Sequence, residues 1–161
     1  MITAAATNRR YLSLTFFLSI CFLASAVGGL ATYASLTGWY DSLHKPNWTP
    51  PQQIFGPIWT ILYAMMAVAA WLVWDRLHGG AFPALKLFGY QLGLNVLWSI
   101  LFFALRSPDA AATEIIVLWL VIGATTFSFL RIHRLAGYLL VPYWIWVTFA
   151  AALNFSIAQS N

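Results

Sequence analysis

One predicted helix carries amide and aromatic side chains together on one face. Its members are Gln91, Asn95, Trp98 and Phe102. At about 100° per residue, these four side chains point within about 60° of one another. Amides donate and accept hydrogen bonds, and an indole adds a flat apolar surface with one N–H donor. The face could bind a ligand or join membrane helices, and the sequence leaves both interpretations open.

Two further segments repeat aromatic residues at helical spacing. The first set is Trp59, Tyr63 and Met66, and the second is Tyr143, Trp146, Ala150, Leu153 and, at its edge, Asn154. A cavity lined by indoles, phenols and a few amides suits a large, flat, mostly apolar ligand. The alternative is an interfacial aromatic belt, which explains Trp39, Trp71 and Trp74 near predicted helix ends. A belt explains Trp59, Trp98 and Trp146 less well.

Conventional catalytic groups are scarce. His44, His78 and His133 fall in connections or at helix ends, so no Ser-His-Asp set or metal cluster can be assembled. Haem iron would lack a histidine ligand at mid-membrane, so a metal-free macrocycle fits this sequence better than haem. We therefore expect no metal or cofactor. The one reservation is His44, whose role the sequence leaves open. Glu114 is the one carboxylate near the interior of an apolar stretch, and we expect it to snorkel to the interface rather than lie buried.

The composition places these faces in a membrane. Of the 161 residues, 61% are hydrophobic and 7% are charged, which is more apolar surface than a soluble domain of this size could bury. The stretches without charge are residues 11–40, 46–74, 87–105, 115–130 and 135–161. Each is near the roughly 20 residues that a membrane helix needs. We therefore predict an all-α membrane protein, a single five-helix bundle over residues 1–161.

Helix start signals divide the chain further. Thr49-Pro50-Pro51 and Ser107-Pro108-Asp109 are typical starts, because Thr or Ser can cap free N–H groups and Pro needs none. The expected helices cover approximately residues 11–36, 52–74, 84–105, 108–130 and 135–157, with a long first loop over residues 37–51.

The first apolar stretch has an alternative interpretation as a secretory signal. Arg9 and Arg10 precede it, and Ala24-Ser25-Ala26 resembles a cleavage site. Its apolar character continues to Leu36, which favours a retained helix; cleavage would leave four spans.

Small residues predict close helix contacts in two places. In the first helix they recur at every fourth position: Ala24, Gly28 and Thr32, with Ser25 and Gly29 beside them. In the third helix, the face opposite the amides holds Gly89, Gly93, Val96 and Ile100. Glycines spaced four apart let two membrane helices dock backbone to backbone. The spacing leaves two interpretations of this second face open: packing inside the same bundle, or contact with another copy of the chain.

Basic residues indicate the orientation. They are spread over helix ends rather than clustered, so the net charge of +4 does not predict a nucleic-acid partner. One side holds Arg9, Arg10, Arg76, Lys86, Arg131 and Arg134, and the other holds Lys45 and Arg106. The positive-inside rule then places the amino terminus in the cytoplasm of a bacterial cell and the carboxyl terminus outside, although another membrane stays open.

Four motifs carry a family resemblance. WYDSLHKPNWTPP, GPIWTILY, QLGLNVLWSILFF and VPYWIWVTFAAALNF follow one another over about residues 39–155. They resemble the translocator protein family, also called the tryptophan-rich sensory protein or peripheral benzodiazepine receptor family, in its bacterial form. The resemblance implies a five-helix membrane fold, usually a homodimer through the third helix, with a pocket beneath the first loop.

The resemblance also implies ligands and functions. Family members bind porphyrins such as protoporphyrin IX, and some bind cholesterol and isoquinoline or benzodiazepine compounds. We expect a porphyrin sensor, regulator or carrier; the alternatives are light-dependent porphyrin degradation, in which Trp59 and Trp146 would act as electron donors, or porphyrin or sterol transport.

The expected pocket combines the carried-over residues with the faces described above. By resemblance it includes Trp39, Trp48, Trp59, Tyr63, Asn95, Trp98, Trp146 and Ala150, with Lys45 and Pro46 shaping a lid. The helical faces add Gln91, Tyr143 and Asn154. We expect Trp39 and Trp48 to roof the cavity, and Lys45 to be able to meet a porphyrin propionate.

Two departures from animal members change the expectation. Leu153-Asn154-Phe155 lacks the phenol of their sterol segment and no basic residue follows Arg134, so we do not expect specific cholesterol binding. A tryptophan early in their fourth helix is replaced near Ala110, so we expect that wall of the pocket to be wider or differently shaped.

Overall fold

The computed structural model describes residues 2–77, 80 and 82–161. Its long helices are α1 (Ile2–Ser35), α2 (Phe55–Leu77), α3 (Phe82–Ser99), α4 (Pro108–Ile132) and α5 (Arg134–Ser160). Wide π-helical turns continue α1 and α3, namely η1 (Leu36–Tyr40) and η3 (Ile100–Ala104), and the 3-10 turn η2 (Gln52–Ile54) precedes α2. All five helices are long and apolar enough to cross a membrane. The prediction of an all-α five-helix bundle is confirmed.

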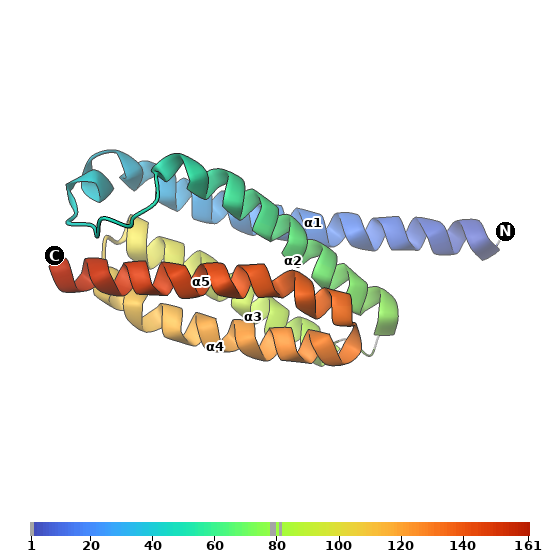
Figure 1. The fold of residues 1–161 in the computed structure, drawn as a ribbon. Helices are drawn as coiled ribbons and strands as arrows, with labels where there is room; N and C mark the ends of the chain where they lie inside the picture. Colours follow the sequence, from blue (N-terminus) through green and yellow to red (C-terminus); the bar gives the residue numbers. More distant parts are fainter. Residues whose placement is uncertain (1, 78–79, 81) are drawn as a thin grey trace.

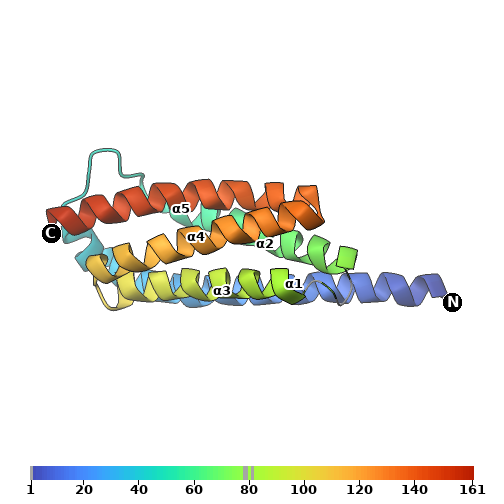
Figure 2. The ribbon, with the colours of Figure 1, turned by 90° about the horizontal axis from the view of Figure 1, so that it is seen from below.

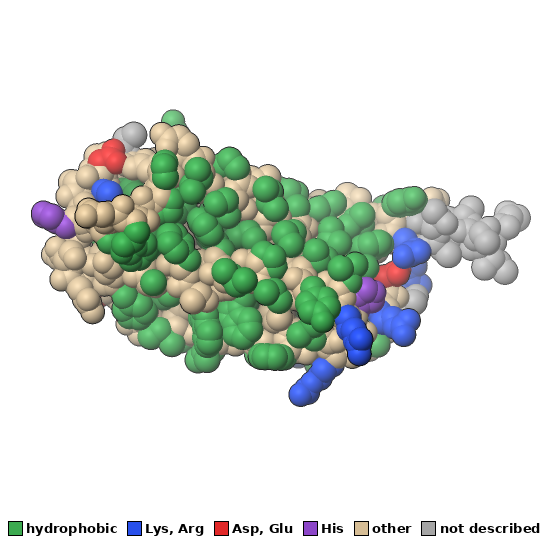
Figure 3. Space-filling view, in the orientation of Figure 1, with side chains coloured by type: hydrophobic (Ala, Val, Ile, Leu, Met, Phe, Trp, Pro, Cys, Tyr) green, Lys and Arg blue, Asp and Glu red, His purple; other side chains and the backbone are tan. Residues whose placement is uncertain are grey.

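The helices form a closed ring in the order α1, α2, α5, α4 and α3, and α3 returns to α1. Figure 1 shows α1 crossing α2 and projecting beyond the other helices at its amino-terminal end. Figure 2 shows α3 beside α1 and α4 beside α5. On the face that Figure 3 shows, apolar side chains cover much of the middle, and the charged side chains gather at the two ends. This distribution is that of a protein surrounded by lipid.

The first helix continues further than expected and shortens the first loop. Helical backbone extends through η1 to Ser42, so the non-helical connection covers residues 43–51 rather than 37–51. The reason is packing: the Trp39 ring meets Phe102 edge-on at 5.8 Å, and the Tyr40 ring lies 5.7 Å from that of Phe103. These contacts hold η1 against η3. We call residues 43–51 the first connection.

Several other helix ends differ from the expected bounds. α1 begins at Ile2 rather than near residue 11, α2 and α5 end at Leu77 and Ser160, and α3 begins at Phe82. Apolar periodicity marks the part of a helix that packs, whereas these additional turns lie at the ends of the bundle, where the helices continue beyond their apolar stretches.

The two expected side-chain caps are absent. The hydroxyl of Thr49 donates to the Pro46 carbonyl at 2.7 Å, and Pro51 takes the N-cap position of η2. Ser107 is the N-cap of α4, but its side chain makes no capping hydrogen bond. The Ser107 carbonyl instead accepts from the Ala111 amide at 3.0 Å, so α4 starts with backbone bonding only.

Candidate ligand-binding site

A cavity of about 320 Å³ lies between α1, α2, α3 and α5, on the side of the bundle nearer the first connection. Ligand sites in proteins commonly have volumes of about 300–1,000 Å³. Six of the expected ligand residues line it: Trp59, Tyr63, Asn95, Trp98, Trp146 and Ala150. The aromatic faces of α2, α3 and α5 thus converge on one hollow, as the helical spacing predicted.

An amide on α3 joins the deep end of this cavity to two phenols. The Tyr63 hydroxyl donates to Asn95 Oδ1 at 2.7 Å, and Asn95 Nδ2 donates to the Tyr143 hydroxyl at 3.1 Å; both bonds are buried. The Trp59 ring packs against the rings of both tyrosines, at 5.7 and 6.2 Å. Asn95 therefore joins α2, α3 and α5 as well as lining the cavity. Tyr143 is fully buried behind it and does not line the wall.

A second polar link fixes the large indole of α3. Trp98 Nε1 donates to Asn154 Oδ1 at 3.0 Å, and Asn154 Nδ2 donates to the Pro108 carbonyl at 2.8 Å. Asn154 thereby ties α5 to α3 and to the start of α4. Because its N–H is already bonded, Trp98 offers a ligand mainly its flat apolar surface.

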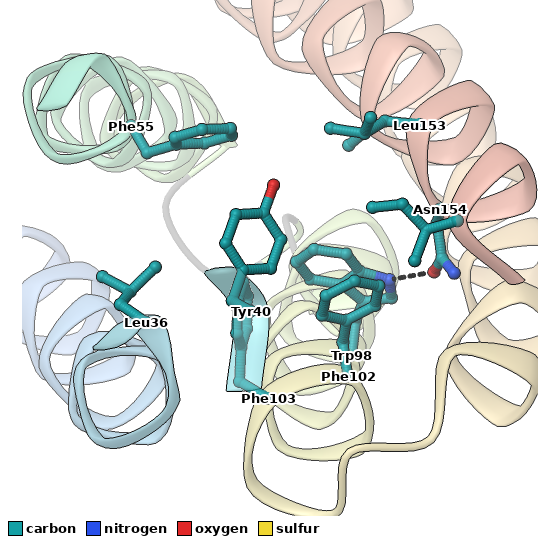
Figure 4. Close-up of a pocket in the computed structure, with 10 residues that line it drawn as sticks. Leu36, Tyr40, Phe55, Trp98, Phe102, Phe103, Leu153 and Asn154 are labelled. Atoms are coloured by element: carbon teal, nitrogen blue, oxygen red, sulfur yellow. Dashed lines mark hydrogen bonds between the residues drawn. The ribbon is translucent and has the colours of Figure 1, made fainter. Parts of the chain in front are cut away.

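A smaller cavity of about 40 Å³ adjoins the first and includes Asn154 in its wall. Figure 4 shows the Tyr40 ring standing between Leu36 and Phe55 on one side and Trp98 and Phe102 on the other. Burial raises the pKa of the Tyr40 phenol, and the neighbouring Asp41 charge raises it further, so this group stays neutral. Sequence reasoning did not single out Tyr40, although it lies within the aromatic motif that begins at Trp39.

Four expected lid residues lie outside both cavity walls. Trp39 packs on Phe102, and the half-exposed Trp48 meets Phe149 edge-on at 5.6 Å. Pro46 also lines neither cavity. The Lys45 ammonium donates to the carbonyls of Tyr40, Asp41 and Leu43 and lies 4.8 Å from the Tyr40 ring centre. Lys45 thus caps the end of the first helix with its ammonium group.

Gln91 and Glu114 are buried, and neither side chain has a hydrogen-bond partner among the residues that the structure describes. Gln91 is fully buried, neither amide atom is hydrogen-bonded, and the residue lines neither cavity. Glu114 is 9% exposed, and neither carboxyl oxygen has a partner. The expectation that Glu114 snorkels to the interface is therefore wrong: it shares the inward face of α4 with Ile115 and Leu118, which are both buried.

No residue of α4 lines either cavity. The expected wider wall near Ala110 is therefore absent from this site, because Ala110 is exposed at the first turn of α4.

Sequence reasoning missed the wall that α1 contributes. This wall consists of Ser25, Gly28, Gly29, Thr32 and Tyr33, and Leu36 of η1 continues it. The small-residue stripe is a visible signal, but such a stripe is equally typical of a surface that packs against another helix. Gly28 does pack, since a Cβ there would lie 3.2 Å from Ser99 Oγ, whereas a Cβ on Gly29 would meet nothing within 4 Å.

The glycine face of α3 is turned away from its own bundle. Gly89 and Gly93 are exposed, and a Cβ added to either would meet nothing within 4 Å. Val96 and Ile100 are half-buried. These positions argue against the alternative that the glycines pack within one chain.

Potential metal ligands are dispersed. Among the residues that the structure describes, no three His, Cys, Asp or Glu side chains form a group that could hold a metal ion. Cys21 is buried, His44 is exposed in the first connection, and His133 caps α5 by accepting from the Ala136 amide at 3.4 Å. His78 lies outside the described residues.

Comparison with known proteins gives consistent matches along the chain. Residues 17–159 match the model of the TspO/MBR family. The tryptophan-rich protein TspO of Chlorobaculum tepidum is 38% identical over 158 residues, which cover 96% of this chain and 99% of that protein. The tryptophan-rich sensory protein of Cereibacter sphaeroides is 40% identical over 89% of this chain and 91% of its own length. The human translocator protein is 34% identical over 86% of this chain and 84% of its own length.

Proposed function

The chain belongs to the TspO/MBR family, and from this premise we propose that it is a tetrapyrrole-binding membrane protein, a sensor, regulator or carrier of porphyrins such as protoporphyrin IX. Its five apolar helices and its family make it an integral multi-pass membrane protein. The observation that carries the proposal is the convergence of Trp59, Trp98 and Trp146 on one cavity with Asn95 at its deep end. Isoquinoline- and benzodiazepine-type compounds are flat and aromatic too, and we propose that they compete for the same hollow.

The wall chemistry suits a macrocycle held by shape and stacking. Indole and phenol rings give a large flat contact area at small cost in side-chain entropy. The amides of Asn95 and Asn154 are already bonded within the protein, so few polar groups remain to select a strongly polar ligand. These properties favour binding over conventional acid-base turnover.

A fluorescence titration tests this function. We expect protoporphyrin IX to quench the tryptophan fluorescence of the purified protein saturably, because several indoles surround the cavity. Trp146→Phe should weaken the quenching and shift its midpoint, whereas Trp71→Phe, which alters an indole near the far end of α2, should leave the midpoint unchanged. Quenching that never saturates and equals that of a tryptophan analogue in detergent would rule the function out.

Light-dependent porphyrin degradation is a second candidate, favoured by the position of both Trp59 and Trp146 in the cavity wall. An indole there could give an electron to a photoexcited porphyrin. Under illumination, we expect the Soret absorbance to decay to a defined product with the native protein and to persist with the Trp59→Phe/Trp146→Phe variant. Equal decay with this variant and with a Trp71→Phe/Trp74→Phe control would exclude catalysis by the cavity tryptophans.

We also propose a homodimer through the face of Gly89, Gly93, Val96 and Ile100, with the amino terminus in the bacterial cytoplasm. The exposure of both glycines supports the contact, and small residues allow two membrane helices to approach closely. The mass of the protein in its detergent complex, with Gly93→Trp as the disrupting variant, checks the dimer.

A further inference from the structure

Four residues line the large cavity and are also exposed on the outer surface. Gly29 and Tyr33 belong to α1, and Gly56 and Thr60 belong to α2. Tyr33 has 80% of its surface exposed. Since α1 and α2 are neighbours in the helix ring, these residues form two facing rims. The cavity therefore reaches the surface at the seam between α1 and α2.

This opening lies within two apolar spans, toward the ends nearest the first connection. Gly29 and Tyr33 fall within the apolar span Asn8–Tyr33, and Gly56 and Thr60 fall within the span Gln52–Leu77. The outward neighbours are apolar as well: Leu30 is 73% exposed and Ile61 is 60% exposed. A ligand in front of this opening would therefore be dissolved in lipid.

Two threonine hydroxyls near the opening are bonded to their own helices. The Thr60 hydroxyl donates to the Gly56 carbonyl at 2.9 Å, and the Thr32 hydroxyl donates to the Gly28 carbonyl at 2.8 Å. Threonine hydroxyls bonded back to the preceding turn leave no free donor facing the hydrocarbon. These two threonines can thus lie near the opening without an unpaired hydroxyl donor.

The end of the bundle under the first connection is bridged by several bonds. Gln52 Nε2 donates to Asp41 Oδ1 at 2.6 Å. The Asn161 side chain holds the His44 backbone from both sides, accepting from its N–H at 2.9 Å and donating to its carbonyl at 3.1 Å. Movement of a ligand through this end would require these bonds to break.

We propose that flat apolar ligands enter and leave the cavity sideways from the bilayer, through the opening between α1 and α2, and that Gly29 and Gly56 keep this opening wide. A Cβ on either glycine would meet nothing within 4 Å. Larger side chains at these two positions therefore narrow the opening without displacing the protein, unlike a change at Gly28, which faces Ser99 at 3.2 Å. The proposal deepens the porphyrin-binding function and rests on it for the ligand's identity.

Stopped-flow kinetics tests the route. Protoporphyrin IX is supplied in phosphatidylcholine vesicles to protein reconstituted in the same lipid, and tryptophan quenching is followed. For Gly29→Leu/Gly56→Leu, we expect association and dissociation both to slow by at least about tenfold, so that Kd changes much less than either rate constant. The control Ala26→Leu, an exposed small residue of α1 outside the cavity wall, should behave like the native protein. Native rates in the double variant, or a weaker Kd at an unchanged association rate, would overturn the proposal.

A second measurement needs no porphyrin and so separates failure of the route from failure of the proposed function. In a Cys21→Ala background, Ser25→Cys places a thiol in the cavity wall. We expect a lipid-soluble maleimide to label it, a charged impermeant maleimide to leave it unlabelled, and Gly29→Leu/Gly56→Leu to slow the labelling. Equal labelling by the impermeant reagent would show that the cavity opens to water instead.

Discussion

Replacing Ala150 with tryptophan is expected to abolish porphyrin binding while the five helices stay folded. Ala150 lines both cavities from α5, and Trp98 of α3 lines both with it. An indole at this position would occupy the space that a macrocycle needs. We expect affinity to fall at least about 100-fold, equivalent to about 2.8 kcal/mol.

The matched control is Ala152→Trp. Ala152 belongs to the same helix, is exposed and lines neither cavity, so the same substitution there adds an indole facing lipid. Titration of both variants with protoporphyrin IX, with circular dichroism as the check on folding, gives the comparison. Binding by Ala150→Trp as tight as by Ala152→Trp would place the porphyrin outside this cavity.

Replacing Asn95 with leucine is expected to destabilise the bundle more than any other single change in the cavity wall. The substitution removes the acceptor of the Tyr63 hydroxyl and the donor to the Tyr143 hydroxyl together. Interhelical hydrogen bonds in membrane proteins average only about 0.6 kcal/mol each. A buried polar group left without a partner costs a further 1–3 kcal/mol or so. We therefore expect a loss of about 2–4 kcal/mol, seen as a lower melting temperature in detergent.

A compensating variant tests the cause of that loss. If unpaired phenols destabilise Asn95→Leu, then removing both hydroxyls with Tyr63→Phe and Tyr143→Phe in the Asn95→Leu background should recover a large part of the melting temperature. A triple variant less stable than Asn95→Leu alone would show that leucine disturbs packing rather than hydrogen bonding.

Periodicity predicted the parts of the site that lie on regular helices. A spacing of 3.6 residues determines which side chains share a face, so Trp59 and Tyr63, Asn95 and Trp98, and Trp146 and Ala150 could be grouped before any fold was known. Three aromatic faces in an apolar chain have to meet inside a bundle, and they do so around one cavity.

The remaining features depend on tertiary packing that the sequence does not encode locally. A stripe of small residues can either pack against another helix or line an open cavity. In α1, the position of Ser99 against Gly28 shows which residue of the stripe packs. The Lys45 ammonium donates to backbone carbonyls at the end of η1. The position of Lys45 in an aromatic segment of the sequence did not predict these hydrogen bonds. Glu114 lies inward because the face of α4 that packs includes it, and ionisable residues inside membrane spans mostly face the bundle interior.

The most direct measurement is an experimental structure of the protein with protoporphyrin IX bound in a lipid environment. We expect the macrocycle inside the cavity bounded by α1, α2, α3 and α5, in van der Waals contact with Trp98 and Ala150. A macrocycle bound on the outer surface of the bundle, with the cavity empty and unchanged, would contradict this expectation.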